Sequence, residues 1–277
     1  MSKTKLSVLF AASVIVAVFV TYIATRATAQ QALPQPLADN EYQVGSVLWF
    51  QNSGEYRALA YQAFALAKLR LDGNLKRCKK KKEPCAIVTD VDETILDNSP
   101  NQAFLIKNRR NFNSPDWLAW CNLEAAKAIP GAVEFFQYAA SKGIKIFYVT
   151  NRQNPEKPAT ANNLRKAGFP DVSDETLLVR TDAQTASKEP RRQAIAQKHR
   201  IIMLLGDNLN DLAQVFERKN VADRFAAVDE LRSEFGSRFI VLPNPMYGDW
   251  EGAIYDYNFR RSEEEKAKMR NVSMQSY

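Results

Sequence analysis

The sequence is poor in the side chains that most often bind zinc or activate a serine. Its 277 residues include one histidine, His199, and three cysteines. A structural zinc site takes four ligands drawn mainly from Cys and His, so we do not expect one here. A Ser–His–Asp triad is not a serious candidate either, because the lone histidine falls at the end of a predicted helix.

The three cysteines are Cys78, Cys85 and Cys121. None lies near position 29, where a lipid-anchored exported protein would carry one. If the chain is exported, Cys78 and Cys85 could close a small disulfide loop and leave Cys121 free. The alternative is that Cys85 is a buried thiol at the start of a strand.

The N-terminus has the pattern of an export signal. Lys3 and Lys5 precede an apolar run over 6–20, and Ala27-Thr28-Ala29 offers a small-x-small cleavage site. We therefore predict a secretory signal peptide over 1–29, a flexible lead-in over 30–40, and a periplasmic or secreted protein. The run is long for a signal, so an uncleaved membrane anchor is the alternative, and this segment is the only membrane contact we expect.

The densest cationic run lacks the interleaved aromatic residues of a single-strand nucleic-acid site. It comprises Arg77 and 79–82, and we interpret it as a solvated loop. No nucleic-acid polymer is therefore expected as a partner. The formal net charge of +7 suits an anionic small-molecule substrate without demonstrating one. The sequence shows no internal repeat, and it leaves open whether the chain forms a homo-oligomer.

The most informative stretch is 86–97. It begins as an apolar, β-prone run and ends in Asp90-x-Asp92-x-Thr94. Burying two carboxylates at the end of a strand is costly unless their charge is offset. A divalent cation is the usual remedy, and Mg²⁺ prefers carboxylate oxygens. Ligands of open α/β sheets also bind at strand ends, so we predict a metal-assisted site; the alternative is a solvated acidic turn.

The rest of the chain alternates strands and helices. Strands are predicted over 145–150, 177–180, 200–206 and 239–242, and helices over 159–167, 188–198 and 210–218. Such alternation predicts an α/β fold with a parallel sheet and crossovers on both faces.

The predicted domain organisation adds a smaller helical cap to this sheet. Residues 41–84 are two helices, separated at 52–54, that form the N-terminal part of the cap, and 85–99 are the first core strand and catalytic loop. Residues 98–100 are a turn, and 100–130 are too long for a simple connection, so they are a helical cap insertion. Residues 131–259 complete the core, and 260–277 are a charged helix and tail.

Polar residues of one chemical theme follow the other predicted strands. They are Thr150 and Asn151, Lys188 near the start of a helix, and Asp207 and Asp211. Ends of parallel strands meet at one edge, where these groups would join Asp90 and Asp92. Four acids, a hydroxyl, an amide and an ammonium group suit phosphoryl transfer through an aspartyl-phosphate.

The ordered set of motifs resembles the haloacid dehalogenase (HAD) superfamily of phosphatases. The motifs are Asp90-x-Asp92-x-Thr94, Val149-Thr150-Asn151, Lys188 and Gly206-Asp207-x-x-x-Asp211. Further stretches resemble the bacterial class C acid phosphatases, a group that contains outer-membrane lipoprotein 5′-nucleotidases; they are 51–61, 97–100, 133–135, 147–152 and 247–252. The likeness implies a HAD-like Rossmannoid sheet with a smaller α-helical cap.

The resemblance also implies roles for the acids. Asp90 would be the nucleophile, and Asp92 would protonate the leaving oxygen and later activate water. Mg²⁺ would be held by the carboxylates of Asp90 and Asp207 and by the backbone carbonyl of Asp92. Asp211 would act behind these ligands. Because Asp92 must be protonated for part of the cycle, mildly acidic pH should favour the first step.

The remaining implied roles concern the substrate. Thr150 and Asn151 would hold phosphoryl oxygens, and Lys188 would offset their charge. Trp117 and Tyr247 would bracket a nucleoside base, which aromatic rings stack with little sequence preference. For Trp117 the alternative is a place in the core of a helix face.

These implications describe an exported Mg²⁺-dependent acid phosphatase that acts on phosphate monoesters, with nucleoside 5′-monophosphates as the expected substrates. The alternatives are a non-catalytic storage or binding protein on the same scaffold and a phosphorylated signalling domain. The presence of Asp90 argues against the first, and the export signal and cap argue against the second. The missing lipid-attachment cysteine distinguishes the chain from lipoprotein members of the group.

Overall fold

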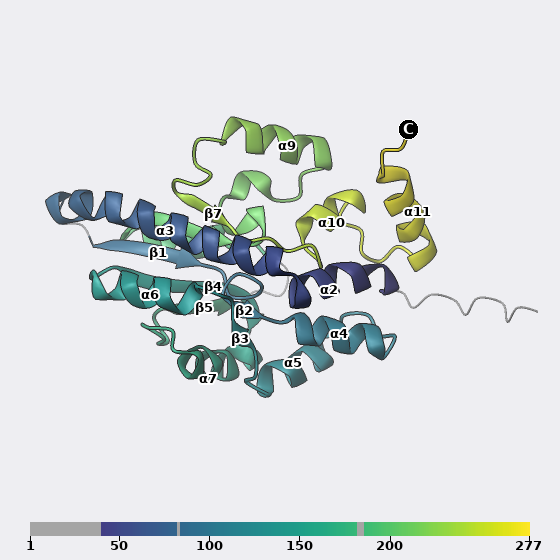
Figure 1. Cartoon of the computed structure of the whole chain (residues 1–277), viewed down its shortest axis with the longest axis horizontal. Coiled ribbons are helices and arrows are strands. Elements are labelled where there is room, and N and C mark those ends of the chain that lie inside the picture. Colours follow the sequence, from purple (N-terminus) through teal and green to yellow (C-terminus); the bar gives the residue numbers. More distant parts are fainter. Residues whose placement is uncertain (1–39, 82–83, 182–185) are drawn as a thin grey trace, which may run out of the picture. The chain divides into compact units, whose positions relative to one another are not determined.

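The centre of the protein is a five-stranded parallel sheet in the order β5-β4-β1-β6-β7 (Figure 1). We describe a computed structural model that covers residues 40–81, 84–181 and 186–277. The strands are β1 (Cys85–Thr89), β4 (Lys145–Gln153), β5 (Leu177–Arg180), β6 (Arg200–Gly206) and β7 (Phe239–Val241). All four pairings are parallel, so the predicted α/β fold class is confirmed.

The strand order reverses at β1. From β1 the chain builds outward through β4 to β5, and it then returns to add β6 and β7 on the other side. Ligands of open α/β sheets bind at such a switch point, beyond the carboxyl ends of the strands. All five β1 residues are buried, as expected for a central strand covered on both faces. Residue Asp90, immediately after β1, therefore stands at the topological centre.

Helices cover both faces of the sheet. On one face lie α3 (Gly54–Lys81), α6 (Ala132–Ser141) and α7 (Lys157–Ala167), whose buried side chains share one apolar cluster with β1, β4 and β5. On the other lie α8 (Glu189–Ala196) and α9 (Val221–Glu230), which contribute to a second cluster. Alternate residues of β1 face opposite clusters: Ile87 belongs to the first, and Ala86 and Val88 to the second.

Helix α3 is longer than predicted. It starts after Ser53, whose hydroxyl accepts a hydrogen bond from the Tyr56 amide at 3.0 Å, as a helix cap should. It continues through Lys81, so the cationic run predicted as a loop is helical up to that residue. A disulfide between Cys78 and Cys85 ties the end of α3 to the start of β1, and Cys121 is free and buried.

The region between β1 and α6 is mainly helical. It contains α4 (Ser99–Lys107) and α5 (Ser114–Asn122), together with a small antiparallel pair, β2 (Leu96–Asp97) and β3 (Lys127–Ala128). The predicted turn at 98–100 is wrong, because α4 starts at Ser99. Pro100 is tolerated in the first turn of this helix, where the backbone amide hydrogen has no partner within the helix. Helix α5 is capped by the side chain of Asn113, which accepts from the Asp116 amide at 2.9 Å.

The two helices of the N-terminal segment 41–84 pack against different parts of the protein. A 3₁₀ turn (Glu41–Gln43) leads into α2 (Val44–Asn52), which contacts α4, whereas α3 contacts α6, β6 and β7 (Figure 1). Of the lead-in predicted over 30–40, only Asn40 is described. It is buried and donates to the Arg110 carbonyl at 2.9 Å, so it is not a flexible residue. The predicted signal 1–29 lies outside the described residues.

The segment after β6 differs from the predicted helix over 210–218. Two 3₁₀ turns replace it, Leu209–Asp211 and Gln214–Phe216. Side chains close the first turn: the backbone amide of Asn208 donates to the Asp211 carboxylate, and the Asn208 side-chain oxygen accepts from the backbone amide of Asn210. Ala213 is then extended, which ends the turn. Helices α10 (Asp249–Ile254) and α11 (Glu263–Ser273) follow β7, and a further 3₁₀ turn over Asn154–Glu156 lies earlier, between β4 and α7.

Within 40–81, 84–181 and 186–277, no helix combines the length and hydropathy that crossing a membrane requires. The apolar run over 6–20, which belongs to the predicted signal peptide or, in the alternative, to a membrane anchor, is not among these residues.

Candidate active site

Three carboxylates meet beyond the ends of the two central strands. Asp90 follows β1, Asp207 follows β6, and Asp211 lies in the 3₁₀ turn after it. An oxygen of each lies within 4.8 Å of the others. The Asp90 amide donates to the Leu205 carbonyl at 2.9 Å, which fixes its backbone against β6. The parallel sheet thus brings together acids more than 100 positions apart.

The ammonium group of Lys188 lies among these acids. It forms ion pairs with Asp90 and, at 2.6 Å, with Asp211, and all three side chains are buried. Burial alone would lower the pKa of Lys188, but the charges of Asp211 and Asp90 raise it above its usual value. Lys188 therefore stays protonated and supplies positive charge where the acids converge.

One ammonium group does not balance three carboxylates. Burial, opposed by Lys188 and reinforced by Asp211, raises the pKa of Asp90 to about 7. Burial, followed by the charges of Asp211 and Asp90, raises the pKa of Asp207 well above its usual range. Clustered carboxylate oxygens in a buried, electron-rich site are the ligand type that a hard divalent cation prefers, so the residues fit such an ion.

Thr94 links two of the acids. Its hydroxyl lies 3.0 Å from Asp207 Oδ1 and 3.3 Å from Asp90 Oδ2, and it accepts the Asp207 amide hydrogen at 2.9 Å. The other oxygen of Asp207 accepts from Asn244 at 2.8 Å. These contacts hold Asp207 so that it faces Asp90.

Asp92 has different surroundings from Asp90. Its carboxylate accepts from the guanidinium of Arg152, from Asn98 and from the hydroxyl of Thr150. Its side chain is 18 % exposed, against 6 % for Asp90. Asp90 is paired with the buried ammonium group of Lys188, whereas Asp92 is paired with a guanidinium and is more exposed. Two carboxylates in such contrasting environments can take two different roles.

The end of β4 is tied to α8 by Arg191. Its guanidinium donates to the Thr150 carbonyl at 2.5 Å and to Asn151 Oδ1 at 2.9 Å. Burial lowers the pKa of Arg191 to about 10. Thr150 is buried, whereas Asn151 is exposed, so only the first is enclosed by the protein.

The two aromatic residues predicted to bracket a base have polar neighbours. Trp117, on α5, is half-buried, and the guanidinium carbon of Arg152 lies 5.2 Å from the centre of its ring. Tyr247 donates its hydroxyl hydrogen to the carboxylate of Glu93. Glu93 is fully buried with a left-handed φ of 57°, and burial, with the charges of Asp92 and Asp207, raises its pKa well above the usual range.

Sequence reasoning gave no role to several residues that the structure brings to the site. They are Glu93, Asn98, Arg152, Arg191 and Asn244. Glu93 and Arg152 adjoin the first and second motifs, and that adjacency was the available signal. Asn98 directly precedes α4 and falls in the stretch 97–100 that resembles the class C acid phosphatases, but that resemblance gave it no role. Asn244 lies in a loop, where asparagine is common for local reasons.

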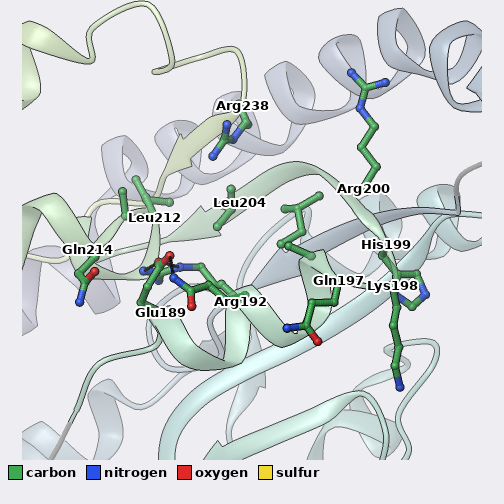
Figure 2. Close-up of a pocket in the computed structure, with 14 residues that line it drawn as sticks. Glu189, Arg192, Gln197, Lys198, His199, Arg200, Leu204, Leu212, Gln214 and Arg238 are labelled. Atoms are coloured by element: carbon green, nitrogen blue, oxygen red, sulfur yellow. Dashed lines mark hydrogen bonds and ion pairs between the residues drawn. The ribbon is translucent and has the colours of Figure 1, made fainter.

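A separate cavity of about 590 Å³ lies between α8 and β6, near Arg238 (Figure 2). None of the site acids lines it. Figure 2 shows Lys198 and Arg200 extending away from its centre. The guanidinium of Arg192 is already bonded to Glu189 and to backbone carbonyls. This cavity is therefore distinct from the site built around Asp90, although Arg192 in its lining donates to the Asp211 carbonyl.

Comparisons of the sequence and of the structure with known proteins point to the same family. The family model described as HAD superfamily, subfamily IIIB (acid phosphatase) matches residues 5–250. Two structures of the class C acid phosphatase from Bacillus anthracis, one of them with tungstate bound, superpose with TM-scores of 0.82 and 0.81. Both are 42 % identical to this chain and cover 87 % of it and 99 % of their own length.

Curated relatives are more distant. Acid phosphatase 1 of Solanum lycopersicum is 28 % identical over 164 residues, and a stem 31 kDa glycoprotein of Glycine max is 27 % identical over 161. The matches span 58 % and 57 % of this chain and 57 % of each relative, so the chain spans little more than half the length of these proteins. By the family model, the motifs and the shared fold, the chain belongs to subfamily IIIB of the HAD superfamily, the acid phosphatases, and resembles its class C members.

Proposed function

We propose that the protein hydrolyses phosphate monoesters through a phosphoryl group carried transiently on Asp90, with Mg²⁺ as the metal ion. The observation that carries this proposal is the buried cluster of Asp90, Asp207 and Asp211 around Lys188, with Asp92 held apart from it. The cluster supplies a nucleophile beside positive charge, and Asp92 supplies a separate carboxyl group for proton transfer.

The residues divide the chemistry as follows. In the first step an oxygen of Asp90 bonds to phosphorus while the ester bond breaks, and the leaving oxygen takes a proton from Asp92. In the second step water loses a proton to Asp92 and displaces the phosphate from Asp90. Bound Mg²⁺, on the carboxylates of Asp90 and Asp207 and the backbone carbonyl of Asp92, would offset the charge of the phosphoryl oxygens.

The phosphoryl group is expected to lie between Lys188 and the end of β4. Lys188 would offset its charge, and Thr150 and Asn151 would bond to its oxygens, with Asp211 keeping Lys188 in place at 2.6 Å. The similar Bacillus anthracis structure holds tungstate, a tetrahedral oxyanion like phosphate, which supports an oxyanion as ligand here.

We further propose nucleoside 5′-monophosphates as substrates and an exported location. Trp117 and Tyr247 offer aromatic rings on which a base could stack, and both are half-buried. The N-terminal pattern over 1–29 and the Cys78–Cys85 disulfide both favour an oxidising compartment, periplasmic or external.

Replacing the nucleophile should abolish turnover. We expect Asp90→Asn to lower kcat by at least about a thousandfold, because an amide cannot form the phosphoryl ester. Phosphate release from nucleoside monophosphates measures this, and circular dichroism verifies the fold. Asp174→Asn, which changes a fully exposed carboxylate paired with Lys157, is the matched control and should keep full activity. Turnover by Asp90→Asn close to that of the control would remove the covalent mechanism.

Metal binding should stabilise the protein more at higher pH. Because the folded pKa of Asp90 is about 7 against an ordinary 3.8, the folded metal-free protein holds a proton that the unfolded chain releases above about pH 4. This retained proton contributes to the free energy of unfolding at low pH, and the contribution is lost as pH rises through about 7. A cation that replaces the proton restores the lost stability. We expect Mg²⁺ to raise Tm more at about pH 8 than at about pH 5.

The same measurement of Tm, with and without Mg²⁺ at about pH 5 and about pH 8, on Asp207→Asn supplies the control for metal binding. This variant loses a predicted ligand and should show a much smaller Mg²⁺-dependent rise in Tm at either pH. Equal stabilisation of the native protein at both pH values, or of the variant and native proteins alike, would contradict a metal site at these acids.

Removing the Trp117 ring should affect recognition of the base. We expect Trp117→Ala to raise KM for adenosine 5′-monophosphate about tenfold, the loss of one stacking contact, with little change for ribose 5-phosphate. The two substrates share the same primary alkyl leaving group, so the comparison isolates the base. Equal changes for both would show that Trp117 packs within the cap and does not contact substrate.

A further inference from the structure

We propose that Arg152 and Asn98 are positioning residues for Asp92. They bind one oxygen of its carboxylate and leave the other to meet the leaving group, and helix α5 of the cap holds both of them in place. The inference rests on the proposed function, in which Asp92 protonates the leaving oxygen.

The two oxygens of Asp92 are not equivalent. Oδ1 accepts three N–H groups, from Arg152 Nε at 2.9 Å, Arg152 Nη2 at 2.8 Å and Asn98 Nδ2 at 2.9 Å. Oδ2 has one hydrogen-bond partner, the hydroxyl of Thr150 at 3.1 Å. A hydroxyl can donate or accept, whereas guanidinium and amide N–H groups only donate. Oδ2 is therefore the oxygen that can carry the proton passed to the substrate.

Arg152 is itself held on several sides. It is 2 % exposed, and its Nη1 donates to the Thr160 hydroxyl at 3.1 Å. Its backbone amide donates to Thr150 Oγ1 at 3.1 Å, and its guanidinium lies 5.2 Å from the centre of the Trp117 ring. A planar fork fixed in this way sets the direction of the Asp92 carboxylate, which a lysine ammonium group could not do.

The amide of Asn98 can adopt only one orientation. Its Oδ1 accepts from the Trp120 indole at 2.8 Å and from Arg152 Nη2 at 3.1 Å, so its Nδ2 must face Asp92. Its backbone amide donates to Glu93 at 2.8 Å. Trp120 therefore acts on Asp92 through Asn98.

Both positioning residues, Arg152 and Asn98, contact the same cap helix. Trp117 and Trp120 belong to α5, and one contacts Arg152 while the other bonds to Asn98. The orientation of Asp92 is consequently coupled to the packing of the cap. Loss of the bond between Trp120 and Asn98 should weaken proton donation without removing the nucleophile.

Leaving groups of different basicity report on proton donation. An alkoxide leaves poorly unless it is protonated, whereas 4-nitrophenolate leaves readily without a proton. We compare kcat/KM, which covers events up to the first phosphoryl transfer, for ribose 5-phosphate and 4-nitrophenyl phosphate. Neither substrate carries a nucleobase, so base stacking does not enter.

We expect Arg152→Met to lower kcat/KM for ribose 5-phosphate by up to about 100-fold, the cost of a misplaced catalytic group. The loss for 4-nitrophenyl phosphate should be at least about tenfold smaller. Arg152→Lys keeps the charge without the fork and should show the same selective loss. Trp120→Phe removes the indole N–H together with part of the ring, and it should show a smaller loss in the same direction. This variant tests the inference if Arg152→Met does not fold.

Arg224→Met is the control for loss of a buried guanidinium. Arg224 is 6 % exposed and donates to the Phe216 carbonyl, without contact to Asp92. Any loss it causes should be the same for both substrates. Equal losses by Arg152→Met, Arg152→Lys and Trp120→Phe on both substrates would overturn the inference.

Asp92→Asn in the same assay separates the inference from the proposed function. If Asp92→Asn discriminates between the two substrates and the Arg152 variants do not, only the positioning role fails. If Asp92→Asn affects both substrates equally, the assignment of Asp92 as proton donor fails, and the positioning role with it.

Discussion

The site depends on the compensation of buried negative charge at the mouth of the sheet. Lys188 stands between Asp90 and Asp211, and Asp207 faces them across Thr94. Burial raises the pKa of Asp90 and Asp207, and the neighbouring carboxylates, which a single ammonium group does not balance, raise it further. The requirement for further positive charge links the fold to its chemistry, because a divalent cation or a proton must complete the balance.

The parallel sheet satisfies this requirement from distant parts of the chain. β1 and β6 are neighbours, so the residues that follow them share one edge, and α8 presents Lys188 to the same point. The cap contributes differently. Its helix α5 contacts no residue of the acidic cluster among the hydrogen bonds and ion pairs described above, and it acts on Asp92 through Arg152 and Asn98. The proposed nucleophile, Asp90, and the proposed proton donor, Asp92, are thus supported by separate parts of one molecule.

Much of this could be predicted from the sequence. β5 and β6 have the predicted bounds because each is an apolar run between polar turns. The strand-end motifs identified Asp90, Asp92, Lys188 and Asp207 before any coordinates. The sequence over 210–218 predicts a helix because its periodicity is helical, but Asn208 closes a 3₁₀ turn with Asn210 and Asp211 instead. Arg152 and Asn98 were missed because their roles arise from packing against α5.

The most direct test of the account is to trap the phosphoryl group on Asp90. If Asp92 activates water in the second step, the Asp92→Asn variant should react with 4-nitrophenyl phosphate in Mg²⁺ but hydrolyse the product slowly. After an acid quench, mass spectrometry of the digested protein should find one phosphoryl group on the peptide that contains Asp90. A phosphoryl group on another residue, or turnover with no covalent product at any time, would contradict the account.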